Sequence, residues 1–186
     1  GFFNFLENVN RKGGILKARA IILKTIGPAL TIGSGGSAGV EGPIATVGGT
    51  IGSVFGQTAR VSGSRMKLLV AAGAAGAIAA TFNAPIAGVM FAMEIVLLGN
   101  YELTSFAAIV ISSGIATVIS RAYYGEFPVF TVPQYNLVSA YEIPLYMLLG
   151  VILGVLAVLY IKVFYYIKDR FTGMKINNQF KPILGA

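Results

Sequence analysis

The chain has 186 residues, of which 55% are hydrophobic and 11% are charged, and its formal net charge is +7. Soluble domains carry about 25% charged residues, so this composition excludes an ordinary soluble domain. The sequence contains no cysteine and no histidine, which excludes disulfides, thiolate sites and histidine proton shuttles. We expect neither a metal site nor a cofactor.

Long stretches without charge predict membrane-spanning helices. Four such runs lie between charged residues, at 42–59, 68–93, 103–120 and 143–161. A run of about 18 or more apolar residues is long enough to cross a bilayer, and these runs lack the alternation of membrane β-strands. The sequence therefore predicts an all-α, polytopic protein that passes several times through the membrane, which we expect to be the cell membrane.

The expected helices are short and interrupted. The pattern predicts a basic amphipathic start over 1–14, a Gly/Ser loop over 33–41, and helices over 15–33, 42–59, 66–81, 85–99, 103–124 and 142–170. A helix over 85–99 reaches only about 22 Å, against a hydrocarbon core of about 30 Å. Helices that end at membrane depth are tolerated around protein-lined or water-lined cavities, as in transporters. The pattern thus favours a transport protein.

The last residues, 181–186, predict the opening of another helix that is cut off. We therefore expect this chain to be a piece of a longer protein, with residues 1–186 forming part of one transmembrane domain.

The basic residues flank the expected spans instead of forming one face. They form two groups: Arg11, Lys12, Lys17, Arg19 and Lys24, and Lys162, Lys168, Arg170, Lys175 and Lys181. Cytoplasmic flanks of membrane helices carry such excess positive charge. We therefore expect a lipid bilayer as a partner and no nucleic acid.

Small residues recur every four positions and predict close helix packing. The repeats are Gly48, Gly52 and Gly56; Ala71, Ala75 and Ala79; Ala72, Gly76 and Ala80; and Gly150 and Gly154. In lipid, such stripes let two helix backbones approach each other.

Glu41 is the one charged residue between Lys24 and Arg60. An ionisable group in an apolar membrane segment is costly and is by default a functional site. The following Gly42 and Pro43 predict the first turn of a helix, where proline is tolerated. Free N–H groups and the positive end of the dipole make such a start an anion site. An ionised Glu41 would compete with an anion for that site, and protonation would release it.

Two other interpretations of this segment are open. Gly33-Ser34-Gly35 faintly matches a dinucleotide-binding fingerprint, which would make the chain a nucleotide-binding enzyme, but that site needs a preceding strand and an acid about 20 residues later. Alternatively, Glu41 is a plain N-cap acid, worth about 1 kcal/mol.

Gly39-Val40-Glu41-Gly42-Pro43 resembles the G-(K/R)-E-G-P motif of the CLC family of chloride channels and chloride/proton antiporters. The resemblance continues over 44–49, 71–80, 82–85 and 87–91 and includes Glu94. It implies a homodimer in which each subunit holds an anion pathway built from two inverted repeats. This chain would supply the later part of the first repeat and the opening of the second.

The resemblance also implies roles for individual residues. Glu41 would be the external gating glutamate, and the backbone N–H groups of Val40, Glu41 and Gly42 would line the outer anion site for chloride. Gly39 and Pro43 complete the motif. Val40 departs from the family pattern, which often has Lys or Arg there, so the attraction of anions to the entrance is weaker.

A second departure follows Glu94. Family antiporters often carry two successive acids here, and the second is the internal proton-transfer glutamate, but this chain has Ile95 in its place. We therefore favour a channel or a weakly proton-coupled transporter, with a chloride/proton antiporter, or a related fluoride or nitrate transporter, as the alternative. Glu94 is either a buried, hydrogen-bonded acid or part of the proton route.

Overall fold

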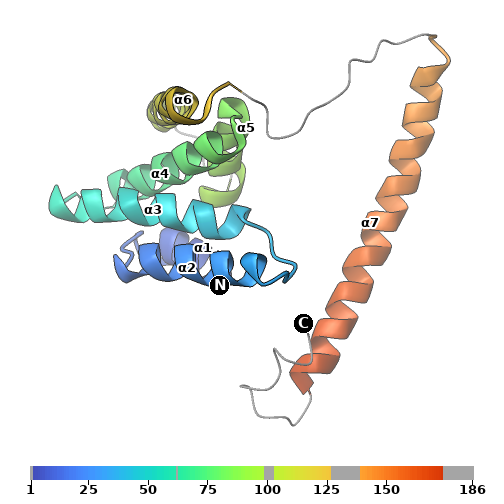
Figure 1. Cartoon of the computed structure of the whole chain (residues 1–186), viewed down its shortest axis with the longest axis horizontal. Coiled ribbons are helices and arrows are strands. Elements are labelled where there is room, and N and C mark those ends of the chain that lie inside the picture. The colour runs from blue at the N-terminus through green and yellow to red at the C-terminus, as the bar shows by residue number, and fades with distance from the viewer. Residues whose placement is uncertain (1, 62, 99–102, 127–138, 174–186) are drawn as a thin grey trace. The chain divides into compact units, whose positions relative to one another are not determined.

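The computed structural model describes residues 2–61, 63–98, 103–126 and 139–173 (Figure 1). The regular elements in these ranges are helices, and no strand occurs among them, which confirms the all-α prediction. The chain divides into two compact units, Gly1–Thr131 and Val132–Ala186. That the whole chain belongs to one transmembrane domain stays a prediction.

The helices follow the predicted order. The first unit contains α1 (Phe2–Arg11), α2 (Arg19–Gly33), α3 (Glu41–Thr58), α4 (Ser64–Phe82), α5 (Pro85–Phe91), the π-helical turn η1 (Ala92–Val96) and α6 (Leu103–Tyr124). The second unit contains α7 (Glu142–Gly173). The expected helix opening at 181–186 lies outside the described residues.

Three helices in the described part of the chain are long and apolar enough to span a membrane. They cover Ser64–Phe82, Ser105–Tyr124 and Glu142–Phe171. Other helices are shorter: the seven residues of α5 and the five of η1 together rise only about 18 Å. The protein is thus a multi-pass integral membrane protein with short helices, as predicted.

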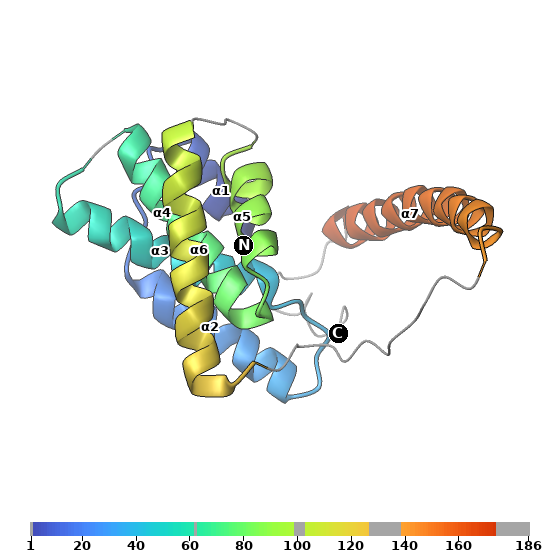
Figure 2. The ribbon, with the colours of Figure 1, turned by 90° about the horizontal axis from the view of Figure 1, so that it is seen from above.

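The core of the first unit is a close crossing of α3 and α4. A Cβ atom on Gly48 would overlap the carbonyl oxygen of Gly73, and one on Gly73 would overlap the carbonyl oxygen of Gly48. The two backbones therefore touch, and this confirms the packing predicted from small residues in α3 and α4. Helix α4 also packs against α6, as Figure 2 shows. In the second unit, a Cβ on Gly150 or Gly154 would meet no described atom within 4 Å.

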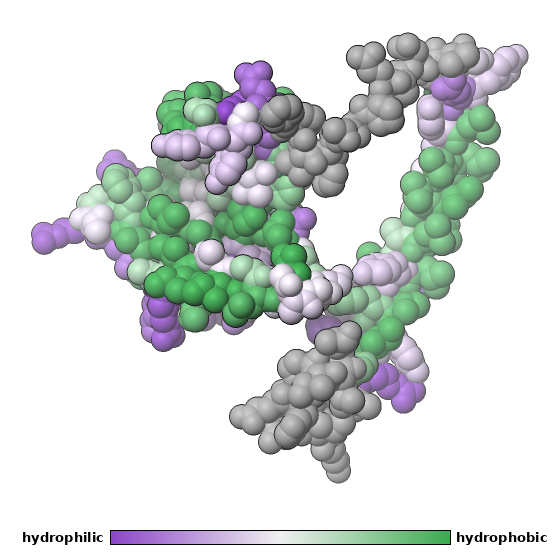
Figure 3. All heavy atoms as spheres, viewed as in Figure 1, coloured by the Kyte–Doolittle hydropathy of each residue, from purple (hydrophilic) through white to green (hydrophobic). Residues whose placement is uncertain are grey.

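Large apolar side chains cover much of the outside of both units, as the green surface in Figure 3 shows. Helix α2 exposes Ile22, Leu23 and Ile26, and α7 exposes apolar residues along its length. Such surfaces suit lipid or neighbouring helices instead of water.

The region predicted as one helix over 85–99 is divided, which corrects that prediction. Regular α-helix ends at Phe91, and the N–H of Leu97 then donates to the carbonyl of Ala92, five residues earlier, at 2.9 Å. The π-helical turn is satisfied from outside, because the Asn10 side chain donates to the carbonyl of Val96 at 3.0 Å. Leu98 follows with a left-handed φ of 52°.

Candidate functional site

The candidate site lies where the loop after α2 enters α3. Val40 is the N-cap, with φ −89° and ψ −17°, and its carbonyl accepts the N–H of Ile44 at 2.9 Å. Glu41 is therefore the first helical residue and not the N-cap, which corrects the plain N-cap alternative. Helix geometry leaves the first N–H groups of α3 without partners inside the helix, and Pro43 has no N–H to leave unpaired.

The carboxylate of Glu41 turns back over the loop that precedes its own helix. A Cβ atom built on Gly39 would lie 2.5 Å from Oε2 of Glu41 and 3.6 Å from its Cδ. Glu41 is exposed in the described structure. The acid thus lies at the positive end of the α3 dipole, where an anion is stabilised.

A second helix begins beside this point. A Cβ on Gly42 would lie 3.3 Å from Cβ of Phe2, the first residue of α1. Phe2 in turn stacks on Phe5 with 5.6 Å between ring centroids and lies 6.1 Å from the ring of Phe91. The close approach of Phe2 to Gly42 brings the starts of α1 and α3 together, so the positive ends of two helix dipoles lie near each other.

The sequence pattern gave no sign of this role for Phe2. Its partners on α3 and α5 are about 40 and 90 residues away along the chain, and no motif surrounds it. Only the three-dimensional packing assigns it to the site.

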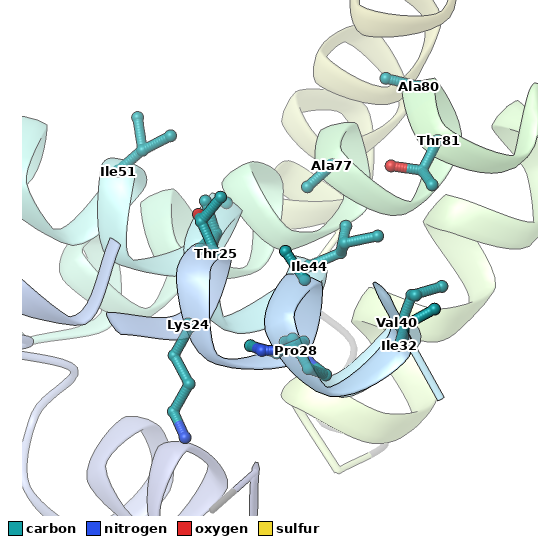
Figure 4. Close-up of a pocket in the computed structure, with 14 residues that line it drawn as sticks. Lys24, Thr25, Pro28, Ile32, Val40, Ile44, Ile51, Ala77, Ala80 and Thr81 are labelled. Atoms are coloured by element: carbon teal, nitrogen blue, oxygen red, sulfur yellow. The ribbon is translucent and has the colours of Figure 1, made fainter. Parts of the chain in front are cut away.

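Val40 contributes its side chain to an apolar groove of about 430 Å³ between α2, α3 and α4. Figure 4 shows Val40 beside Ile32, with Ile44 nearby. A Lys or Arg at position 40, which the family motif often has, would put a charge into this apolar lining. Valine is therefore compatible with the local packing.

Glu94 lies in η1 and not on helix α3, which begins with Glu41. No hydrogen bond or ion pair joins these two acids among the described residues, and the side chains of Glu94 and Ile95 are both exposed there. The described ranges thus give no support to a buried, hydrogen-bonded Glu94. A π-helical turn inside an α-helix is frequently found at functional sites.

The loop over 33–41 follows helix α2, which ends at Gly33. A dinucleotide site needs a strand before its glycine-rich turn, and the described part of the chain contains no strand. The nucleotide-binding interpretation is therefore wrong.

Comparisons with known proteins agree on one family. The family model described as "Voltage gated chloride channel" matches residues 1–186. The chloride channel protein CLC-f of Arabidopsis thaliana is 38% identical over 161 residues, which are 81% of this chain and 21% of that protein. The H(+)/Cl(-) exchange transporter ClcA of Vibrio parahaemolyticus is 36% identical over 163 residues, which are 87% of this chain and 35% of that protein.

A solved structure has the same fold. The crystal structure of a slow cyanobacterial Cl-/H+ antiporter matches with a TM-score of 0.77 at 25% sequence identity, and the match covers 87% of this chain and 38% of that chain. The present chain therefore spans between 21% and 38% of the length of these three relatives.

Proposed function

Because this chain belongs to the voltage-gated chloride channel family, we propose that it forms part of a chloride pathway in which Glu41 is the gate. The observation that carries the proposal is the position of the Glu41 carboxylate, which folds against Gly39 at the start of α3. There it occupies the place where a helix N-terminus attracts an anion.

The gate works by competition. When ionised, the Glu41 carboxylate holds the positive end of α3, and a chloride ion is kept out. The backbone N–H groups of Val40, Glu41 and Gly42 bind the chloride once the carboxylate leaves. Protonation removes the negative charge that holds Glu41 in place, so acidification opens the path.

We further propose that chloride movement is coupled to protons. Two of the similar proteins are named as exchangers: the H(+)/Cl(-) exchange transporter ClcA and the cyanobacterial Cl-/H+ antiporter. These names favour exchange over the channel function that Ile95 suggested. Since isoleucine cannot carry a proton, the inner part of the proton route would use Glu94, whose exposed side chain lies on the π-helical turn. A channel is the second candidate, favoured by the aliphatic residue at 95 and by the name of CLC-f.

The decisive experiment reconstitutes the full-length protein in liposomes and measures chloride and proton fluxes together. Glu41→Gln and Glu41→Ala should abolish the rise of chloride flux on acidification and should stop proton uptake. Glu7→Gln is the control, because Glu7 is an acid on α1 that pairs with Lys12 at 3.2 Å. If both Glu41 variants kept the pH dependence of the wild type, the gate assignment would fail.

The same preparation separates exchange from channel function. A chloride gradient imposed across the wild-type liposomes should drive protons uphill. Chloride flux without any proton movement would establish a channel instead.

The complete protein is proposed to be a homodimer. Exposed apolar residues on α5 and α6, including Ile86, Met90, Ile111 and Val118, support an interface in this region. Mass measurement of the detergent-solubilised, full-length protein tests it, and a monomer at all concentrations would contradict it.

A further inference from the structure

A second pocket lies beside α2, separate from the apolar groove. It has a volume of about 320 Å³ and lies between α1, the start of α2 and α3. Sites for small molecules have volumes of about 300–1,000 Å³, so this pocket can hold a small polar group. Its polar lining consists of Asn4, Asn8, Lys17, Arg19, Lys24 and Thr46, joined by Thr50.

The charge in this pocket has one sign. Lys17, Arg19 and Lys24 line it, and no acidic residue does. Among the described residues, none of these three cations forms an ion pair, because the ion pair found there joins Lys12 to Glu7. Cations around one partly enclosed space repel each other and concentrate a counter-anion.

The threonine hydroxyl groups in the pocket are not free to donate to a bound anion. Thr46 donates to the carbonyl of Gly42 at 2.8 Å, and Thr50 donates to the carbonyl of Thr46 at 2.6 Å. Both side chains are buried, and their hydroxyl hydrogens already form hydrogen bonds to backbone carbonyls of α3. The three cations remain as the charged donors, and this favours an anionic ligand over a neutral one.

Lys24 connects the pocket to the apolar groove between α2, α3 and α4. It lines both spaces. Figure 4 shows its ammonium group pointing away from Ile44 and Ala77, while the rest of α2 borders the groove. Lysine commonly lays its apolar stem along a hydrophobic surface and places its charge at the polar end. The basic pocket and the apolar groove thus share Lys24 in their linings.

We propose that this pair of spaces binds an anionic phospholipid, with its phosphate in the basic pocket and an acyl chain along the groove. Basic pockets between membrane helices bind anionic headgroups in this way. The three pocket cations also belong to the group of basic residues that flanks the expected membrane spans, and such flanks lie near the level of the lipid headgroups. The headgroup pocket contains no residue of the Gly39–Pro43 motif, whereas Val40 and Pro43 line the groove. The headgroup part of the proposal is therefore independent of the gate.

Native mass spectrometry of the full-length protein in detergent tests the headgroup. The wild type should retain phosphatidylglycerol in preference to phosphatidylcholine. Lys17→Gln combined with Lys24→Gln should weaken phosphatidylglycerol binding about tenfold or more, since each cation near a headgroup contributes on the order of 1 kcal/mol. Lys12→Gln combined with Arg65→Gln removes the same charge outside the pocket and should leave binding unchanged. Arg19→Gln alone, at an exposed position, should give an intermediate loss.

Two further arms identify the ligand. Inorganic phosphate should not displace the lipid, because it lacks a chain for the groove. Ala29→Phe, which narrows the groove at an exposed position of α2, should weaken lipid binding without affecting the fold seen by circular dichroism. The proposal would be overturned if the protein retained both lipids equally, or if the pocket and control variants lost binding equally. Displacement of the lipid by phosphate, or unchanged lipid binding by Ala29→Phe, would overturn it as well.

Discussion

Gly39 and Glu41 share one space: a Cβ atom on Gly39 would lie 2.5 Å from Oε2 of Glu41. Two non-bonded carbon and oxygen atoms cannot approach so closely, so a side chain at position 39 would take the place of the carboxylate. The glycine of the motif is therefore needed for the position of its acid. The relationship gives Gly39 a physical task that its place in the motif alone does not explain.

Gly39→Ala should loosen the proposed gate. The added methyl group displaces the Glu41 carboxylate from the start of α3, so chloride should enter more readily while Glu41 is ionised. We expect chloride flux at neutral pH to rise severalfold and its further increase on acidification to shrink, as measured in liposomes holding the full-length protein. Gly33→Ala is the control, because its Cβ would meet nothing within 4 Å. A wild-type pH profile for Gly39→Ala would contradict the expectation.

Gly52→Ala should destabilise the crossing of α3 and α4. A Cβ on Gly52 would overlap the carbonyl oxygen of Leu69, and backbone cannot move aside as a flexible side chain can. Overpacking of this kind costs about 1–3 kcal/mol, and the thermal unfolding midpoint in detergent should fall. Gly27→Ala in α2 meets nothing within 4 Å and should keep or raise the midpoint, because alanine favours helix over glycine by about 0.5–1 kcal/mol. Equal midpoints for the two variants would refute the close crossing.

Ser53→Ala should loosen the turn between α1 and α2. The buried Ser53 hydroxyl donates to the carbonyl of Gly14 at 2.7 Å and accepts the N–H of Leu16 at 2.9 Å. Removing it leaves the carbonyl of buried Gly14 and the N–H of half-buried Leu16 without this partner, and an unpaired buried group costs about 1–3 kcal/mol. Hydrogen exchange at Leu16 should accelerate and the unfolding midpoint should fall. Thr58→Ala removes an exposed hydroxyl and should change neither, so a similar effect from both would count against the role of Ser53.

Much of this fold could be predicted from local sequence, because membrane helices are marked by charge-free length and their starts by residues such as Pro43 and Pro85. The start of α3 was predicted within one residue from Glu41, Gly42 and Pro43. The meeting of Phe2 with Gly42 could not be predicted, since it depends on contacts between distant helices. The π-helical turn escaped prediction for a similar reason: its end is satisfied by Asn10 from another helix.

Ile95→Glu tests whether the missing second acid limits proton coupling. Ile95 is 38% exposed and follows Glu94 on the π-helical turn, so a carboxyl group fits there without entering the core. If the inner proton route passes this turn, the variant should move more protons per chloride than the wild type in the same liposome assay. Ile95→Gln adds a polar group of similar size that does not titrate, and it should leave the ratio unchanged.

The companion variant Glu94→Gln separates the two acids. If Glu94 carries the inner proton step in the wild type, this change should abolish proton uptake while chloride still moves, and adding Ile95→Glu to it should restore coupling in part. Partial restoration is the most to expect, because Glu94 and Ile95 are consecutive exposed residues of one turn but consecutive helical side chains point in different directions. Unchanged coupling in both Glu94→Gln and Ile95→Glu would exclude this turn from the proton route and leave Glu41 as the acid that sets the pH response.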